Sequence, residues 1–296
     1  MAALREAATM IRAGGIVAVP TETVYGLAAD ARDSAAVARI YAAKGRPDFN
    51  PLIVHVTDLA AAERIAVFDD DARVLSTRFW PGPLTLVLPL REGAGIASLV
   101  TAGLATVAVR VPAHRAMRAL LAEAAAPLAA PSANASNGIS PTRAEHVAAS
   151  LGAAVPLILD DGATTEGVES TIVAGRTILR PGPVTAEMLA EVLPVMAGAT
   201  AHVSAPGQLA THYAPAKPLR LDAVSGGAGE WLIGFGAVTG DDTLSAGGDP
   251  VEAAARLFDT LHRADASDCT RIAVAPVPEA GIGAAINDRL RRAAHR

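Results

Sequence analysis

Residues 44–55 place the strongest limits on how this chain can fold. A helical pattern over 34–43 runs into Lys-Gly-Arg-Pro, where the glycine favours a helix C-cap and the proline prevents continuation. An apolar run over 52–56 then predicts a strand that leaves the same loop. Two cations, an amide and an imidazole therefore gather on a loop held between a helix end and a strand start, where binding sites commonly form.

The two cations of this loop have two explanations. Cations near a helix C-terminus stabilise the helix dipole, so Lys44 and Arg46 need no ligand to account for them. The chain, however, has only two lysines, at positions 44 and 217, among its 25 lysines and arginines. A lysine beside an arginine in such a chain indicates a need for a compact ammonium, and so favours an anion-binding loop.

Short apolar runs that end in polar residues recur along the first 200 residues. Strands are predicted over 16–19, 84–90, 106–111, 155–159, 171–173 and 177–179, and helices over 2–13, 58–66, 70–79, 113–124, 143–150 and 185–193. Arg110 and Arg180 end two of these strands, and a charge there must reach water or meet an anion. The hydroxyl-rich loop over 131–142 precedes a helix, a position that favours phosphate. A solvated arginine and a plain capped turn explain these features equally well.

Composition excludes several classes of protein. No run of 18 apolar residues occurs and the first residues lack a signal-peptide core, so we expect no membrane span and a cytoplasmic location. The single cysteine, Cys269, rules out an internal disulfide. A net charge of −5 disfavours nucleic-acid binding over the whole surface. Seven scattered histidines predict no metal site built from protein side chains.

Common signatures of nucleotide and hydrolase sites are missing. No glycine loop is followed by Lys-Ser or Lys-Thr, and no Gly-x-Ser-x-Gly occurs. Gly-Phe-Gly at 234–236 and Gly-Ile-Gly at 281–283 lack the third glycine of a dinucleotide site. What remains is a set of cations, hydroxyls and amides on loops between strands, which suits a small zwitterion and a polyphosphate. The residues by themselves lead no further.

A change in composition divides the chain near residue 200. Residues 198–218 carry Gly, Ser, Pro, Thr and His with little periodicity, as linkers do, yet they include a His-Tyr pair that a passive linker does not need. Two strands and two helices of a small α/β unit follow, over 231–235, 271–274, 251–264 and 284–294. We therefore predict a first domain over 1–200, a linker over 201–218 and a C-terminal domain over 219–296.

Several motifs, in order along the whole chain, carry a resemblance to a known family. They are Pro-Thr-Glu-Thr-Val-Tyr-Gly-Leu at 20–27, Lys-Gly-Arg-Pro at 44–47 with Asn-Pro-Leu at 50–52, Trp-Pro-Gly-Pro-Leu-Thr at 80–85, Pro-Ser-Ala-Asn at 131–134, Ser-Pro-Thr at 140–142, Glu-Ser-Thr at 169–171, His-Tyr-Ala-Pro at 212–215 and Ala-Ile-Asn-Asp-Arg-Leu at 285–290. Together they resemble the threonylcarbamoyl-AMP synthase family in its longer, two-domain form. Asn137 stands where that family more often has glycine, and asparagine tolerates the left-handed backbone of such a turn.

The resemblance implies a fold, a reaction and partners. The fold is α/β: a twisted mixed sheet with a large concave pocket (YrdC-like), plus a small C-terminal α/β Rossmann-like domain on a linker that can act as a lid. The reaction is nucleotidyl transfer, in which L-threonine, bicarbonate or CO2 and ATP, with Mg²⁺, give threonylcarbamoyl-AMP and pyrophosphate. The implied partners are the proteins that transfer the threonylcarbamoyl group to tRNA, with a weak contact to tRNA itself and none to membranes.

The resemblance also implies roles for residues of this chain. The implied catalytic residues are Lys44 and Arg46. Those implied to bind L-threonine are Thr23, His55, Arg110, Ala130 and Ser170. Those implied to contact ATP are Arg46, Asn50, Thr106, Ser132, Asn134, Ser140, Arg180 and Tyr213, and Lys44, Thr21 and His212 complete the set.

Two other functions stay open at this point. First domains of this kind resemble binders of double-stranded RNA, although an acidic chain with two lysines disfavours that as the main role. Carbamoyl transfer from carbamoyl-AMP, as in hydrogenase maturation, is a related reaction. The acylphosphatase and zinc-finger segments that usually accompany it are absent from this sequence.

Overall fold

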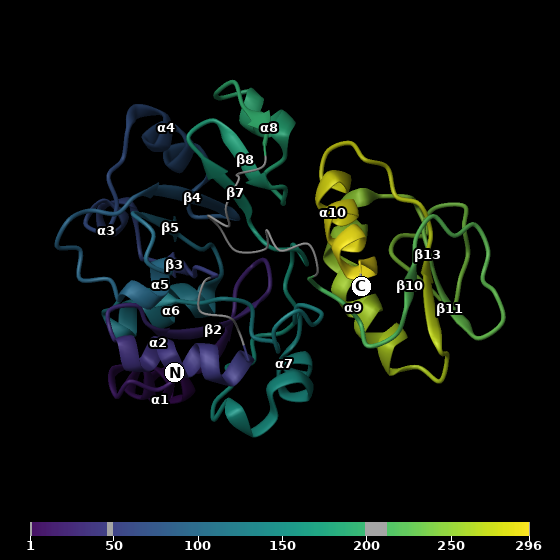
Figure 1. The fold of residues 1–296 in the computed structure, drawn as a ribbon, viewed down its shortest axis with the longest axis horizontal. Coiled ribbons are helices and arrows are strands. Elements are labelled where there is room, and N and C mark those ends of the chain that lie inside the picture. Colours follow the sequence, from purple (N-terminus) through teal and green to yellow (C-terminus); the bar gives the residue numbers. More distant parts are fainter. Residues whose placement is uncertain (1, 46–49, 199–211, 296) are drawn as a thin grey trace.

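The computed structural model describes residues 2–45, 50–198 and 212–295 and shows two sheets, each with its own helices (Figure 1). The helices are α1 (Ala2–Arg12), α2 (Ser34–Lys44), α3 (Leu59–Glu63), α4 (Asp70–Phe79), α5 (Ser98–Thr101), α6 (Arg115–Ala124), α7 (Ala144–Leu151), α8 (Ala186–Ala190), α9 (Pro250–Ala266) and α10 (Gly283–Ala294), with a 3-10 turn η1 (Gly152–Ala154). The strands are β1 (Val17–Pro20), β2 (Tyr25–Asp30), β3 (Ile53–His55), β4 (Leu84–Pro89), β5 (Thr106–Arg110), β6 (Leu128–Ala129), β7 (Thr171–Ala174), β8 (Thr177–Arg180), β9 (Met196–Ala197), β10 (Leu219–Arg220), β11 (Glu230–Gly234), β12 (Asp242–Thr243) and β13 (Arg271–Val274). Within the described ranges, no helix has both the length and the apolarity to cross a membrane.

The first sheet is mixed, as predicted. Its nine described strands lie in the order β1-β2-β6-β3-β5-β4-β7-β8-β9. Three neighbouring pairs, β3 with β5, β4 with β7 and β8 with β9, run parallel, and the other neighbours run antiparallel. The parallel register pairs His55 of β3 with Arg110 of β5. The two residues are therefore the last of their strands and lie side by side at the same end of the sheet.

Alternate residues of the strands face two apolar layers, because side chains of a strand point to opposite sides in turn. Val19 of β1 packs in one layer with Ile11 of α1 and Leu120 of α6. Ala18 of the same strand packs in the other layer with Ile40 of α2. The strands at this end of the sheet are therefore covered by helices on both faces, as in other layered α/β folds.

Local signals fix the end of α2, where the predicted anion-binding loop begins. Asp33 caps the helix N-terminus with its side chain, and Gly45 ends the helix in left-handed backbone with φ +58°. Lys44, the last helical residue, is 3% exposed. Residues 46–49, and with them Arg46, lie outside the described residues.

The second sheet is parallel and belongs to the predicted C-terminal unit. Its described strands lie in the order β10-β13-β11-β12. Figure 1 shows α9 and α10, in yellow-green and yellow respectively, between this sheet and the rest of the molecule. The apolar cluster around these two helices also takes in Val24, Ile139 and Val168 from the first 200 residues. The two parts of the molecule thus share an apolar interface.

The structure differs from the sequence-based expectation at two places. Residues 155–159 form no strand: Ile158 makes a single bridge to Ala18, and Pro156 inside the run has no N–H for a ladder hydrogen bond. The motif at 20–27 spans a turn and the start of a strand that was not predicted from the sequence. Residues 21–24 turn, with the Thr21 hydroxyl donating to the Val24 carbonyl at 2.7 Å, before β2 returns along β1 as a hairpin.

Gly182→Ala tests the close packing behind β7. A Cβ at position 182 would lie 2.4 Å from the Thr171 nitrogen and 2.7 Å from the Glu169 carbonyl oxygen. Because backbone atoms would have to move, we expect the free energy of unfolding to fall by about 1–3 kcal/mol, measured by urea denaturation. Gly226→Ala is the matched control, since its nearest neighbour would be the Leu232 Cβ at 3.5 Å, an ordinary contact. Equal stabilities of the two variants would contradict this packing argument.

Candidate active site

Ten residues of the predicted set line one cavity. They are Thr21, Thr23, His55, Arg110, Ala130, Ser132, Ser170, Arg180, His212 and Tyr213. The cavity has a volume of about 50 Å³. That is room for only a few waters. Segments far apart in the sequence thus meet around a small space at which many polar side chains converge.

Arg110 is buried at the end of β5 and is held from three sides. Its Nε donates to the Gly82 carbonyl at 3.1 Å, and Nη1 donates to the Thr23 hydroxyl at 3.0 Å. Its Nη2 contacts Glu22 Oε1 at 2.6 Å as an ion pair, although the angles do not make this a hydrogen bond. A guanidinium has five N–H donors, so this arrangement leaves some for a second carboxylate.

Glu22 is absent from the set predicted from the sequence, yet it faces Arg110. Burial raises the pKa of Glu22, but the charge and close contact of Arg110, together with hydrogen bonds from backbone N–H groups, hold that pKa below its usual range. The carboxylate is therefore ionised at neutral pH and offsets the charge of Arg110. A signal for it was present: an acidic residue between Thr21 and Thr23, directly after a buried strand.

His55 is neutral in this site. It is 2% exposed, and burial first, then the charge of Arg110, lower its pKa to about 3. Among the described residues, none makes a hydrogen bond with His55 Nδ1. Because buried polar atoms are rarely left unpaired, this nitrogen marks a place for a ligand atom.

Lys44 braces the hydroxyl-rich loop from the end of α2. Its Nζ donates to the carbonyl oxygens of Ser132, at 2.5 Å, and Asn134. The Asn134 side chain in turn donates to the Gly138 carbonyl at 2.8 Å. Asn137 has φ +67°, which confirms the left-handed turn expected there. The helix end and the loop thus form one unit beside the cavity.

Arg180 is buried at the end of β8 and holds Ser170. Its Nε and Nη2 donate to the Ser170 carbonyl at 3.1 and 2.9 Å, and Nη2 also donates to the Ser170 hydroxyl at 3.2 Å. That hydroxyl shares a 2.8 Å hydrogen bond with Thr85. Burial lowers the pKa of Arg180, but a guanidinium still keeps its proton.

Buried positive groups in and beside the cavity outnumber buried negative groups. The buried cations are Lys44, Arg110, Arg180 and Arg289, and the buried carboxylates are Glu22 and Glu169. Four positive and two negative charges leave a local excess of positive charge in the part of the chain that the structure describes. Such a site favours anionic ligands, whatever the net charge of the whole protein.

Not all predicted residues reach the cavity. Thr106 starts β5, whereas Arg110 ends it, and Thr106 pairs with Pro89 of β4. Four residues of strand span about 13 Å, so the structure does not bring Thr106 to the cavity. Asn50 is buried beside Tyr41, whose hydroxyl donates to the Asn50 carbonyl at 3.0 Å. Ser140 meets the site through Glu169, whose carboxylate accepts its hydroxyl hydrogen.

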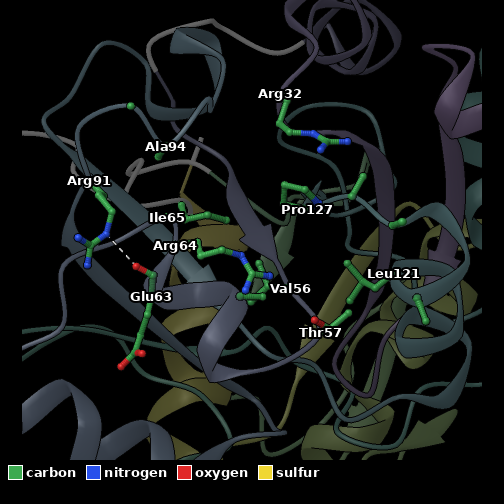
Figure 2. Close-up of a pocket in the computed structure, with 15 residues that line it drawn as sticks. Arg32, Val56, Thr57, Glu63, Arg64, Ile65, Arg91, Ala94, Leu121 and Pro127 are labelled. Atoms are coloured by element: carbon green, nitrogen blue, oxygen red, sulfur yellow. Dashed lines mark hydrogen bonds between the residues drawn. The ribbon is translucent and has the colours of Figure 1, made fainter.

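A larger cavity, of about 870 Å³, lies elsewhere in the first domain (Figure 2). Arg32, Arg64 and Arg91 border it, together with apolar side chains such as Leu121, and Arg91 donates to the Glu63 carbonyl at 2.8 Å. Its lining includes no residue of the predicted set. Size alone therefore does not mark the candidate site, which is distinguished by converging buried polar groups.

Family comparisons cover almost the whole chain. A family profile described as telomere recombination matches residues 9–182, and one described as threonylcarbamoyl-AMP synthase, C-terminal domain, matches residues 184–295. The chain is 39% identical to the threonylcarbamoyl-AMP synthase of Bacillus subtilis in an alignment that covers 98% of this chain and 92% of that protein.

Solved structures agree with these matches. The crystal structure of Pyrococcus abyssi Sua5 complexed with L-threonine is 37% identical, with a TM-score of 0.91 over 98% of this chain and 94% of the other. A variant of the same protein, with a histidine and the following tyrosine replaced by alanine, is 36% identical, with a TM-score of 0.88 over 98% and 92%. Similarity of this extent, in sequence and in fold, shows that the chain belongs to the threonylcarbamoyl-AMP synthase family of nucleotidyltransferases.

Proposed function

We propose that this protein joins L-threonine, bicarbonate or CO2 and ATP into threonylcarbamoyl-AMP and pyrophosphate at the cavity described here. The observation that carries the proposal is the meeting of Arg110, neutral His55 and Arg180 around one cavity. The buried cation Lys44 lies next to it and holds the carbonyl of Ser132, which lines the cavity. An amino acid carboxylate and a triphosphate are both anions, and the local excess of positive charge suits both. The related Pyrococcus abyssi structure that contains L-threonine supports the choice of amino acid.

In this proposal Arg110 binds the threonine carboxylate through the N–H groups that do not donate to Gly82 or Thr23. Neutral His55 accepts a hydrogen bond from the amine and adds no positive charge beside it. Thr23, Ser170 and the backbone of Ala130 contact the rest of the amino acid. Glu22 keeps Arg110 in place and offsets part of its charge.

The proposed chemistry proceeds in two bond-forming steps. The threonine amine adds to CO2, or to bicarbonate with loss of water, and forms a carbamate. A carbamate oxygen then attacks the α-phosphorus of ATP, the bond from that phosphorus to the bridging oxygen breaks, and pyrophosphate leaves with the electron pair. A carbamate is a weak nucleophile that decomposes in water, so positioning and exclusion of water contribute more here than a strong base.

The triphosphate is assigned to residues from both sides of the cavity. They are Lys44, Arg46, Ser132, Asn134, Ser140 and Arg180, with Asn50 and Tyr213 toward the nucleoside. Thr106, at the other end of β5 from Arg110, does not line the cavity and stays a weaker candidate for a nucleotide contact. Among the described residues, no group of three or more His, Cys, Asp or Glu could hold a metal ion. Mg²⁺ therefore fits as a companion of the phosphates, whose charge it offsets, rather than as an ion caged by the protein.

We also propose that the linker closes the site. His212 and Tyr213 line the cavity, and the Tyr213 hydroxyl has no hydrogen-bond partner among the described residues although the residue is 1% exposed. These two residues form the chain's single His-Tyr dipeptide, the type of pair that the Pyrococcus abyssi variant lacks. A closed linker keeps water from the carbamate.

The product, a reactive mixed anhydride, then passes to cytoplasmic proteins that transfer the threonylcarbamoyl group to tRNA. The protein also makes a weak contact with tRNA itself in this proposal.

The reaction is tested directly with the purified protein, ATP, Mg²⁺ and bicarbonate. Pyrophosphate should be released only when L-threonine is added, and mass spectrometry should find threonylcarbamoyl-AMP. Pyrophosphate released without threonine would indicate carbamoyl-adenylate chemistry instead. Salt-sensitive RNA binding without turnover would indicate an RNA-binding module. Either of these outcomes contradicts the proposed function.

Arg110→Lys tests the carboxylate site. A lysine keeps the charge but loses the planar fork, so we expect the KM for threonine to rise about 10- to 100-fold while the KM for ATP changes much less. The control is Arg115→Lys, because Arg115 pairs with Asp161 but its side chain is 83% exposed. Steady-state kinetics of both variants provide the measurement. A threonine KM that is equal in Arg110→Lys and the control would refute the assignment.

His55→Gln tests whether the imidazole is neutral in the folded protein. The folded pKa of about 3 lies below the ordinary value of 6.5, so between these pH values the unfolded state binds a proton that the folded state does not. Stability of the wild type should therefore fall as pH is lowered through this window, and His55→Gln should lose part of that fall. Urea denaturation from pH 7 to pH 4 measures it, with His295→Gln, at an exposed position, as the control. An unchanged slope in His55→Gln would show that the imidazole is not held neutral.

A further inference from the structure

Arg289 belongs to α10, yet most of its polar contacts are with the first 200 residues. The residue is 0% exposed. Its Nε donates to Glu169 Oε2 at 3.0 Å, Nη2 donates to the Glu169 carbonyl at 3.3 Å, and Nη1 donates to the Pro181 carbonyl at 2.6 Å. Nη1 also contacts Asp288 at 3.1 Å, and the guanidinium carbon lies 5.6 Å from the centre of the Tyr213 ring. The guanidinium is therefore fixed in one place, across the interface from its own sheet.

Glu169 connects this arginine to the cavity. Glu169 lines the cavity, and its second oxygen accepts the hydroxyl hydrogen of Ser140. The next residue, Ser170, carries the carbonyl and hydroxyl that hold Arg180. An unpaired carboxylate at this position would attract Arg180 and repel phosphates. The charge of Arg289 offsets that carboxylate without itself lining the cavity.

The helices that carry and flank Arg289 also hold both loops of this part of the site. Ile139 and Val168, the residues before Ser140 and Glu169, pack in the apolar cluster of α9 and α10. His262 of α9 places its Nε2 3.1 Å from the Ser140 carbonyl oxygen. Two loops of the catalytic part are thus located by the C-terminal part.

We infer that Arg289 is a positioning residue for ATP: it offsets the charge of Glu169 and keeps that carboxylate on Ser140, so that Arg180 meets the phosphates instead of the carboxylate. The inference rests on the proposed function and gives the C-terminal unit a direct part in it. Arg289 touches no substrate and acts through Glu169. The C-terminal unit then completes the nucleotide side of the site, while the threonine side, around Arg110, is built by the first sheet.

Arg289→Met in the full chain is the first test. We expect the KM for ATP to rise about 10- to 100-fold, with a much smaller change in the KM for threonine. Adding Glu169→Gln to Arg289→Met should recover much of the ATP affinity, because no unpaired carboxylate then remains. Arg289→Lys, which keeps the charge, should show a smaller loss than Arg289→Met. Arg291→Met is the control, since Arg291 lies on the same helix but is exposed and pairs with Glu279.

Calorimetric binding of a non-hydrolysable ATP analogue, on variants shown to be folded by circular dichroism, separates this role from a purely structural one. A structural role would lower the melting temperature of Arg289→Met without separating ATP from threonine. The inference is overturned if Arg289→Met and Arg289→Lys bind the analogue as tightly as the wild type does. It is also overturned if the double variant does not recover analogue affinity. In either case the proposed function still stands as long as the wild type makes threonylcarbamoyl-AMP. A wild type that binds the analogue but makes no threonylcarbamoyl-AMP overturns the function, and analogue binding still decides the role of Arg289. A wild type that binds no analogue overturns both.

Discussion

The buried ion pair between Arg289 and Glu169 is a directional contact between the two parts of the molecule that involves a residue lining the cavity. Removing two charges from water is costly, and their attraction compensates only when the remaining donors and acceptors are also satisfied. Here Pro181 accepts from the arginine and Ser140 donates to the carboxylate. The apolar contacts of α9 and α10 add burial, but apolar contacts have little directionality. The ion pair, together with the contact of His262 with the Ser140 carbonyl and the pairing of Arg143 with Asp259, therefore defines how the C-terminal helices sit against the loops of the site.

The need of buried charges for hydrogen-bond partners also explains the rest of the site. Each buried cation is held by oxygen atoms: Arg110 by Glu22 and two neutral acceptors, Lys44 by carbonyl groups, and Arg180 by Ser170. Carbonyl oxygens orient a cation but do not cancel its charge, so the cavity remains positive inside a protein whose net charge is −5. Recognition of anions here is a property of a few buried groups, and the sign of the overall charge carries no information about it.

Sequence patterns identified the parts of this structure that depend on neighbours along the chain. Gly45 after a helix and arginines at strand ends are local signals, and they correctly placed Lys44, Arg110 and Arg180 at element ends. The pairing of Arg289 with Glu169 spans 120 residues, and no local pattern encodes it. Thr106 is close to Arg110 in sequence, but it lies at the other end of the same extended strand and does not line the cavity, so its nucleotide contact stays a prediction. The roles taken from the family resemblance stay predictions for the residues that the cavity does bring together.

The small volume of the cavity bears on the proposed function. A space of about 50 Å³ is smaller than threonine and ATP together, so in the proposed function the substrates also occupy space next to this cavity or displace residues that border it. In the closure proposed for the linker, opening would expose Tyr213, whose ring lies 5.6 Å from that of Phe258, and this loss of apolar burial would disfavour the open form. Opening would also return water to the buried cations, which would favour the open form. In the proposed site, phosphates and a carboxylate would replace that water as partners of Arg180 and Arg110 and so favour the closed form. The proposal thus couples substrate binding to exclusion of water from the carbamate through the same few side chains.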